Sequence, residues 1–222
     1  MFITEKQLVN KLKSNFSQIC NWDSVKYFTK VSEEVNLGFG VADLVISKIN
    51  LKNASKKNIT LNYFDIVIYK IVESNQVISF EKIKEITKAN DLVIRKSLSK
   101  LMVSCYINNH DSLFQFSKSY QTIITDLIAI EAKLKNWKRA LEQAFRYKWF
   151  AKKAFVVLDS INIQPAIKNI TQFERLNVGL AEINKQGKVI IHFKPLKNQP
   201  IDEKMWILFN EEIKKSFLRN KK

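Results

Sequence analysis

Cysteine, histidine and long apolar runs are scarce in this chain of 222 residues, and each scarcity excludes a class of protein. Its two cysteines, Cys20 and Cys105, lie in different segments. This spacing argues against a disulfide framework or a zinc site and favours a reducing compartment. His110 and His192 have no second histidine, cysteine or acid at ligand spacing. No stretch approaches the roughly 20 apolar residues of a membrane span, and the N-terminus lacks a secretory signal. We therefore expect a cytoplasmic protein that has no membrane segment.

Glycine is also scarce, with four residues in the whole chain. Neither a glycine-rich phosphate loop nor a serine-based triad pattern occurs, so the sequence does not support ATP-dependent chemistry. Gly38 and Gly40 flank Phe39 and predict a tight turn between strands at 31–37 and 39–47. Hydrophobic residues make up 46% of the chain, which is enough for a sizeable core.

Positive charge, in contrast, is abundant, and the formal net charge is +16 at pH 7. Residues 119–222 hold 20 Lys and Arg against 10 Asp and Glu, whereas residues 60–118 hold 8 against 6. A positive field of this kind favours a polyanion, either nucleic acid or an anionic membrane surface. A lysine-rich composition that only aids solubility is the alternative. We take nucleic acid as the expected partner.

The middle of the chain predicts a small helical module, which follows a polar, basic linker at 48–60. Its expected elements are helices at 61–73, 80–88 and 91–103 and a short hairpin at 105–117. The residues of the third helix expected to face inward are Leu92, Leu98, Leu101 and Met102. Three helices followed by a two-stranded ribbon resemble a winged helix-turn-helix.

The flanking segments predict an α/β domain. It begins with a helix at 4–15, for which Thr4 and Gln7 have the spacing of a capping box. The later elements are a strand at 126–133, a helix at 136–150, a strand at 153–158, a helix at 164–172, strands at 176–183 and 187–194, and a helix at 202–218. We expect the strands before and after the module to share one sheet. Residues 1–50 and 119–222 would then form one discontinuous domain, interrupted by an inserted domain at 51–118.

The apolar run at 126–133 ends in an acid and a base, Glu131 and Lys133. Side chains two positions apart in a strand project from the same face, so this pair would lie side by side at the end of a buried strand. An unpaired charge seldom occupies such a place, because its desolvation is costly. The alternative is an ordinary exposed ion pair. Other acid-x-Lys patterns, at Asp202 and Glu212, lie in the expected terminal helix and indicate a solvated face.

The ordered set Asp43, Glu131-Ala132-Lys133, Gln143 and Tyr147 resembles the PD-(D/E)XK nuclease superfamily, and its Gln-x-x-x-Tyr pair resembles the RecB-like branch. The resemblance covers residues 1–50 and 119–195. Ala42 stands where the name of the family has proline. The resemblance implies a restriction-endonuclease-like mixed sheet flanked by helices, and a divalent cation bound by an Asp on one strand and the (D/E)xK of the next.

The implied cofactor is Mg²⁺ or Mn²⁺. Mg²⁺ prefers hard oxygen ligands, usually one or two carboxylates with water and phosphate. The resemblance implies Asp43 and Glu131 as the carboxylate ligands, with the Ala132 carbonyl and Glu34 as further candidates. Lys133 would orient the attacking water or stabilise the transition state. Positions i and i+4 share a helix face, so Gln143 and Tyr147 would both point at the site as catalytic residues.

Nucleic-acid contacts are expected in two places. The helix at 136–150 interleaves basic and aromatic residues. Most of these are better explained by an amphipathic helix packed on the sheet, which leaves Arg139 and Arg146 as candidate phosphate contacts. In the inserted module the third helix would read the DNA groove. Its candidate contacts are Lys88, Asn90, Arg95, Lys96, Ser99 and Lys100.

These patterns together predict a metal-dependent deoxyribonuclease that hydrolyses phosphodiester bonds in duplex DNA held by the inserted module. A non-enzymatic DNA-binding or regulatory protein that keeps the nuclease-like sheet as a scaffold is the alternative. A second alternative is an interaction module that uses the winged helix to bind a protein partner, and the sequence leaves a homodimer open.

Overall fold

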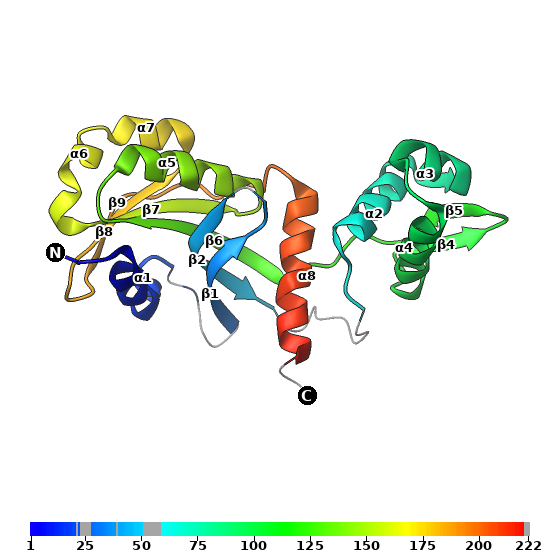
Figure 1. Ribbon diagram of the computed structural model, residues 1–222, viewed down its shortest axis with the longest axis horizontal. Coiled ribbons are helices and arrows are strands. Elements are labelled where there is room, and N and C mark those ends of the chain that lie inside the picture. Colours follow the sequence, from blue (N-terminus) through cyan, green and yellow to red (C-terminus); the bar gives the residue numbers. More distant parts are fainter. Residues whose placement is uncertain (21, 23–27, 39, 51–58, 220–222) are drawn as a thin grey trace. The chain divides into compact units, whose positions relative to one another are not determined.

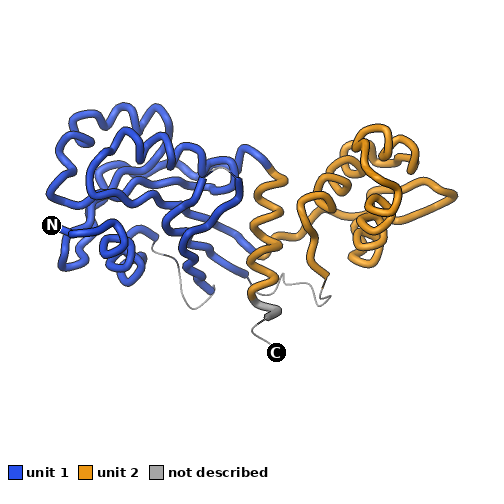
Figure 2. Tube along the Cα trace, in the orientation of Figure 1, with its two compact units in different colours: residues 1–51, 124–202 blue, residues 52–123, 203–222 orange. Residues whose placement is uncertain are grey.

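The computed structural model describes residues 1–20, 22, 28–38, 40–50 and 59–219. Phe39, in the expected turn, and most of the expected linker at 48–60 lie outside the described residues. The chain divides into two compact units, coloured separately in Figure 2. Unit 1 comprises residues 1–51 and 124–202, and unit 2 comprises residues 52–123 and 203–222. One unit is therefore interrupted by the other, as expected, although the C-terminal segment groups with the inserted part.

Unit 1 contains a six-stranded mixed sheet (Figure 1). Its strands, in spatial order, are β1 (Phe28–Asn36), β2 (Val41–Ile49), β6 (Ile124–Lys133), β7 (Lys153–Asp159), β8 (Gly179–Ile183) and β9 (Val189–Phe193). The pairs β6/β7 and β7/β8 are parallel and the other pairs are antiparallel. The expected common sheet is therefore confirmed, and the module separates two strands, β2 and β6, that are neighbours in space.

Helices cover both faces of this sheet (Figure 1). Helix α1 (Glu5–Ser14) begins after Thr4, whose side chain accepts a hydrogen bond from the Gln7 N–H. The apolar side of α1 packs in one core cluster with residues of β2, β6, β7 and β8. On the other face lie α5 (Trp137–Arg146), α6 (Gln164–Ile167) and α7 (Ile170–Leu176). Because both faces are covered, β6 is buried along nearly its whole length, which explains its continuous apolar sequence.

Two expected helices of unit 1 are divided in the structure. The segment expected as one helix at 136–150 ends as α5 at Arg146 and continues as the 3₁₀ turn η3 (Tyr147–Trp149). The segment expected at 164–172 forms α6 and α7, with the N-cap of α7 at Asn169. Short 3₁₀ turns also occur at η1 (Phe16–Gln18) and η4 (Ser160–Asn162).

Unit 2 contains four helices, α2 (Tyr63–Asn75), α3 (Phe80–Thr87), α4 (Asp91–Val103) and α8 (Glu203–Arg219), among its described residues. Its antiparallel sheet has the order β3 (Val77–Ser79), β5 (Leu113–Phe116), β4 (Ile107–His110). Strand β3 was not expected, because three residues are too few to show an alternating pattern. Asp111 and Ser112, both with positive φ, connect β4 to β5, as the common two-residue hairpin turns require.

The prediction that Leu92 faces inward is wrong, since 76% of its surface is exposed. Leu98 and Leu101 are buried as expected, and Met102 is partly buried against the same core. One helical residue turns the direction of the side chain by about 100°. Leu92 is therefore turned by about 200° from the buried Ile94, away from the core stripe.

The C-terminal helix belongs to unit 2 rather than to the expected nuclease-like domain. Ile207 lies in the core cluster of unit 2. The buried carboxylate of Glu211 accepts hydrogen bonds from the Leu61 N–H at 2.8 Å and from the Tyr120 hydroxyl at 2.5 Å. These buried contacts attach α8 to Leu61 and Tyr120, which lie before and after the helical module in the sequence. The periodicity of apolar residues within α8 does not reveal this attachment.

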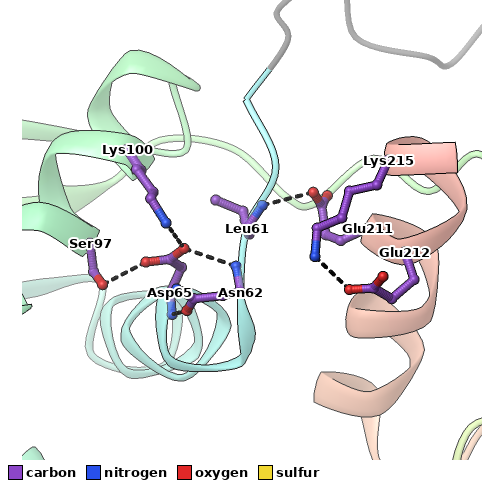
Figure 3. A network of polar contacts seen from close by, with 8 residues as sticks. All are labelled: Leu61, Asn62, Asp65, Ser97, Lys100, Glu211, Glu212 and Lys215. Atoms are coloured by element: carbon purple, nitrogen blue, oxygen red, sulfur yellow. Dashed lines mark hydrogen bonds and ion pairs between the residues drawn. The ribbon is translucent and has the colours of Figure 1, made fainter. Parts of the chain in front are cut away.

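A buried acid also connects helices within unit 2 (Figure 3). The Asp65 carboxylate accepts hydrogen bonds from the Asn62 N–H at 2.9 Å, the Ser97 hydroxyl at 2.6 Å and the Lys100 ammonium at 2.5 Å. The Asn62 side chain in turn accepts from the Asp65 N–H, which completes a capping box at the start of α2. Asp65 therefore satisfies its charge internally and ties α2 to α4.

Candidate active site

Asp43 and Glu131 meet at the end of the β2/β6 ladder. The last pair of this antiparallel register joins Leu44 to Ile130, so Asp43 and Glu131 follow as the next opposed positions. Opposed residues of neighbouring strands project from the same face of the sheet. The Asp43 carboxylate accepts a hydrogen bond from the Ala132 N–H at 2.8 Å, which anchors it to the motif strand. The structure therefore brings together two acids that the inserted module separates in sequence.

Glu131 is buried, with 1% of its surface exposed. Its carboxylate accepts a hydrogen bond from the Tyr147 hydroxyl and forms an ion pair at 3.0 Å with the Lys133 ammonium. The Tyr147 hydroxyl also lies 2.7 Å from the carbonyl oxygen of Val41. A tyrosine hydroxyl carries one proton and cannot donate fully to two acceptors. A positive charge or a proton at Glu131 would resolve this competition.

Lys133 lies between two acids. Its ammonium is 3.0 Å from a Glu131 oxygen and 3.0 Å from a Glu5 oxygen. Burial alone lowers the pKa of Lys133, but its hydrogen bonds with Glu131 and Glu5 more than reverse this effect, and the pKa is raised. Lys133 therefore stays an ammonium ion and contributes a positive charge rather than a general base.

Glu5 is the site residue that the sequence analysis missed. It occupies the first position of α1, directly after the Thr4 cap. Acids are common in the first turn of a helix, where they interact favourably with the helix dipole, so its position alone did not single it out. Only the contact with Lys133 identifies Glu5 as part of the site.

The protonation of the two strand acids is perturbed. Burial raises the pKa of Asp43, and this effect exceeds the lowering by the Ala132 N–H and by Lys133. Burial likewise raises the pKa of Glu131, with a further contribution from the charge of Asp43, while Tyr147 and Lys133 lower it. Perturbed carboxyl groups of this kind gather at functional sites, because fixing two acids close together is costly without a ligand.

Gln143 and Glu34 are the other predicted site residues. Gln143 of α5 lies four residues before Tyr147 of η3, and its buried side-chain oxygen has no hydrogen-bond partner among the described residues. Glu34 is an exposed residue of β1 with a φ of 51°, and it lies between the register pairs Glu33/Leu44 and Val35/Ala42. The charge of Glu34 contributes to the raised pKa of Asp43, so Glu34 lies within electrostatic reach of the site.

The donor set fits a small hard cation. Within the described part of the chain, no group of three or more His, Cys, Asp and Glu side chains is placed to hold a metal ion. Mg²⁺ commonly takes one or two carboxylates and completes its shell with water and substrate phosphate. Asp43 and Glu131 could supply the two carboxylates, and the amide oxygen of Gln143, which has no hydrogen-bond partner among the described residues, is of the same hard-donor type. The contact of Ala132 with Asp43 is made by its N–H and not by the carbonyl oxygen that the resemblance implies as a ligand.

Arg139 and Arg146 are both exposed on α5. A side chain added at Gly40 would lie 3.9 Å from the Arg146 guanidinium and 3.8 Å from the Tyr147 ring. Arg146 therefore lies beside the start of β2, next to the tyrosine that contacts Glu131. The aromatic Trp137 is buried against Phe173, as expected for a helix that packs on its own domain.

The candidate nucleic-acid residues of unit 2 have different environments. Lys88, Lys96 and Ser99 are exposed. Asn90 is exposed, and its side-chain oxygen accepts a hydrogen bond from the Leu92 N–H as the cap of α4. Arg95 is exposed, with its guanidinium 4.4 Å from the centre of the Phe80 ring. Lys100 differs from the others, because its ammonium binds the buried Asp65 and stabilises unit 2 (Figure 3).

Comparison with known proteins gives no relative: no family model, no curated protein and no solved structure matches this chain. Among the described helices, none is both long enough and apolar enough to cross a membrane. The protein is of the α/β class, with a mixed six-stranded sheet flanked by helices.

Proposed function

We propose that this protein is a Mg²⁺- or Mn²⁺-dependent nuclease that hydrolyses phosphodiester bonds in DNA. The observation that carries the proposal is the meeting of Asp43, Glu131 and Lys133 at one end of the β2/β6 ladder. A buried carboxylate (Glu131) and a partly buried one (Asp43), both with raised pKa values, form with one ammonium a site that is unfavourable for the free protein. A divalent cation and a phosphate supply the charges that such a site lacks.

The fold supports the same proposal. The Asp strand β2 is the direct neighbour of the motif strand β6, which is the arrangement that resemblance to the PD-(D/E)XK superfamily implies. In unit 2 the order α2, β3, α3, α4, β4, β5, with β5 paired to both other strands, supports a winged-helix interpretation. The net charge of +16 favours a polyanionic substrate.

Each side chain of the site has a distinct task in this proposal. Asp43 and Glu131 would hold the cation, which lowers the pKa of a bound water and neutralises charge on the phosphate. Lys133 keeps its ammonium form and stabilises negative charge that develops on the phosphate oxygens. Tyr147 holds the Glu131 carboxylate in place, and Glu5 orients Lys133. Arg146, at the edge of the site, would bind a phosphate of the DNA backbone.

Incubation of supercoiled plasmid with the full chain and Mg²⁺ or Mn²⁺ tests the activity. We expect the wild type to nick or linearise the plasmid, and Glu131→Ala and Lys133→Ala to abolish cleavage. The matched control is Glu142→Ala, which removes an exposed acid from α5 and should leave cleavage unchanged. Circular dichroism of each variant establishes that it is folded.

Calorimetric titration with Mn²⁺ in the absence of DNA tests the cation site independently. We expect Asp43→Asn to weaken Mn²⁺ binding strongly, because a neutral amide replaces one of two carboxylate ligands. Cleavage that survives both Glu131→Ala and Lys133→Ala would contradict the site. A folded wild type that binds DNA but cleaves none would support the alternative, a DNA-binding protein that keeps this sheet as a scaffold.

A further inference from the structure

The exposed side of α4 combines aliphatic and cationic residues. Leu92 is 76% exposed and Val93 is 46% exposed, both in the first turn of the helix. Lys96 and Ser99 follow Leu92 at intervals of four and three residues, so the three share one face of the helix. Leu92 and Val93 adjoin one another, so the first turn of α4 exposes a pair of aliphatic side chains at the start of an otherwise polar stripe.

The opposite side of α4 packs in the core of unit 2. Ile94, Leu98 and Leu101 lie in the core of unit 2. Asp91 is the single acid of α4, and its carboxylate forms an ion pair at 2.8 Å with Lys84 of α3. The exposed stripe therefore presents aliphatic groups and positive charge, with the one negative charge of the helix already neutralised. This surface is complementary to a polyanion that carries apolar groups.

We propose that α4 enters the major groove of duplex DNA and that Leu92 and Val93 contact the 5-methyl groups of thymine, so that the protein prefers A·T-containing sites. In helix-turn-helix proteins the first residues of the recognition helix contact the base edges. In the major groove the thymine methyl group is the apolar feature that aliphatic side chains recognise. Lys88, Arg95 and Lys96 are exposed, lie within four residues of Leu92 in the sequence, and would bind the flanking phosphates.

The DNA partner is preferred to a protein partner because of charge. A protein surface that buried Leu92 would also have to neutralise the exposed cations around it, whereas the phosphates of duplex DNA flank the major groove on both sides. The inference rests on the DNA binding in the proposed function but does not depend on cleavage. It changes the role of the helix from general backbone binding to recognition of a particular base.

Fluorescence anisotropy of the full chain in EDTA tests the inference without cleavage. The probes are a short alternating d(A-T) duplex, the same duplex with deoxyuridine in place of every thymidine, and an alternating d(G-C) duplex. Deoxyuridine lacks the 5-methyl group but keeps the hydrogen-bonding groups of thymine. We expect the wild type to bind the thymine duplex about threefold or more tightly than the uracil duplex, since burial of one methyl group contributes about that factor.

The variant Leu92→Ala should weaken binding to the thymine duplex and lower the thymine-to-uracil ratio toward one. The matched control is Leu196→Ala in unit 1, because Leu196 is 75% exposed and should leave the ratio unchanged. Equal wild-type affinity for the thymine and uracil duplexes overturns the inference, as does a ratio that Leu92→Ala preserves. Failure to bind any duplex also overturns it and leaves the stripe to a protein partner. Plasmid cleavage without discrimination of thymine from uracil would refute this inference alone, whereas discrimination without cleavage would refute the nuclease alone.

Discussion

Replacing Tyr147 with phenylalanine removes one hydroxyl group from the buried side of the candidate active site. The hydroxyl donates to the Glu131 carboxylate and lies 2.7 Å from the Val41 carbonyl oxygen. The Tyr147 ring is fully buried, so no water readily replaces the lost donor. Removal of one partner from a buried polar group costs about 1–3 kcal/mol. We therefore expect Tyr147→Phe to lower the free energy of unfolding by about 2 kcal/mol near neutral pH.

The same substitution should change the pH dependence of activity. Burial raises the pKa of Glu131 above its usual value, and the Tyr147 hydrogen bond is the largest effect that lowers it. Its loss raises the pKa further. Because a carboxyl group binds a metal ion in its ionised form, the acid limb of Mn²⁺-dependent cleavage should move to higher pH.

The linked effect on stability has a definite sign. When the pKa of a carboxyl group is higher in the folded protein than in the unfolded protein, the group stabilises the folded protein at pH values below the unfolded pKa. This stabilisation is lost as the pH rises through the folded pKa. The pKa of Glu131 is raised in the wild type and would be raised further in Tyr147→Phe. The destabilisation caused by the substitution should therefore be larger at pH 8 than at pH 5.

Equilibrium unfolding in urea at several pH values, followed by tryptophan fluorescence, measures the first effect. Plasmid cleavage across the same pH range measures the second. The matched control is Tyr63→Phe, because Tyr63 is exposed and its substitution should change the free energy of unfolding by less than about 0.5 kcal/mol. Wild-type stability together with an unmoved acid limb in Tyr147→Phe would refute the role assigned to this hydroxyl.

Three further predictions concern other parts of the structure. Asp65→Ala should lower the free energy of unfolding by about 3 kcal/mol, because it removes the acceptor of three hydrogen bonds and leaves Lys100 and the buried Ser97 without that partner. A loss of less than about 0.5 kcal/mol, measured by urea unfolding, would contradict the network. Glu5→Gln should lower plasmid cleavage several-fold by releasing Lys133, whereas Glu33→Gln, which breaks a surface ion pair outside the site, should not, and equal rates would exclude Glu5 from the site. Cys20 is buried and burial raises its pKa to about 12, so iodoacetamide should label only the exposed Cys105 of the native chain within minutes, as peptide mass spectrometry would show.

Local patterns were enough to predict most elements. The cap at Thr4 and the helical period that follows it placed α1 within one residue at each end, and the apolar run at 126–133 identified the buried strand β6. Both signals arise from residues that are close in sequence. The cap accepts a hydrogen bond from an N–H three positions on. Whether apolar residues alternate along a strand or run continuously is visible within a few residues, because the strand period is two. The wrong prediction for Leu92 was also local. The angle between Leu92 and the buried Ile94 around the helix axis follows from their spacing of two residues in the sequence.

The sequence by itself determined the α/β class, the interruption of one domain by another, and the residue types at the end of β6. Only the tertiary structure decided that Asp43 opposes Glu131, that Glu5 contacts Lys133, and that the C-terminal helix packs in unit 2. The physical reason is that strand register and helix packing depend on the fit between surfaces formed by distant segments, whereas caps, turns and periodicity depend on neighbours within a few residues. A carboxylate at the end of a strand acquires its chemistry from the side chains that other elements bring to it.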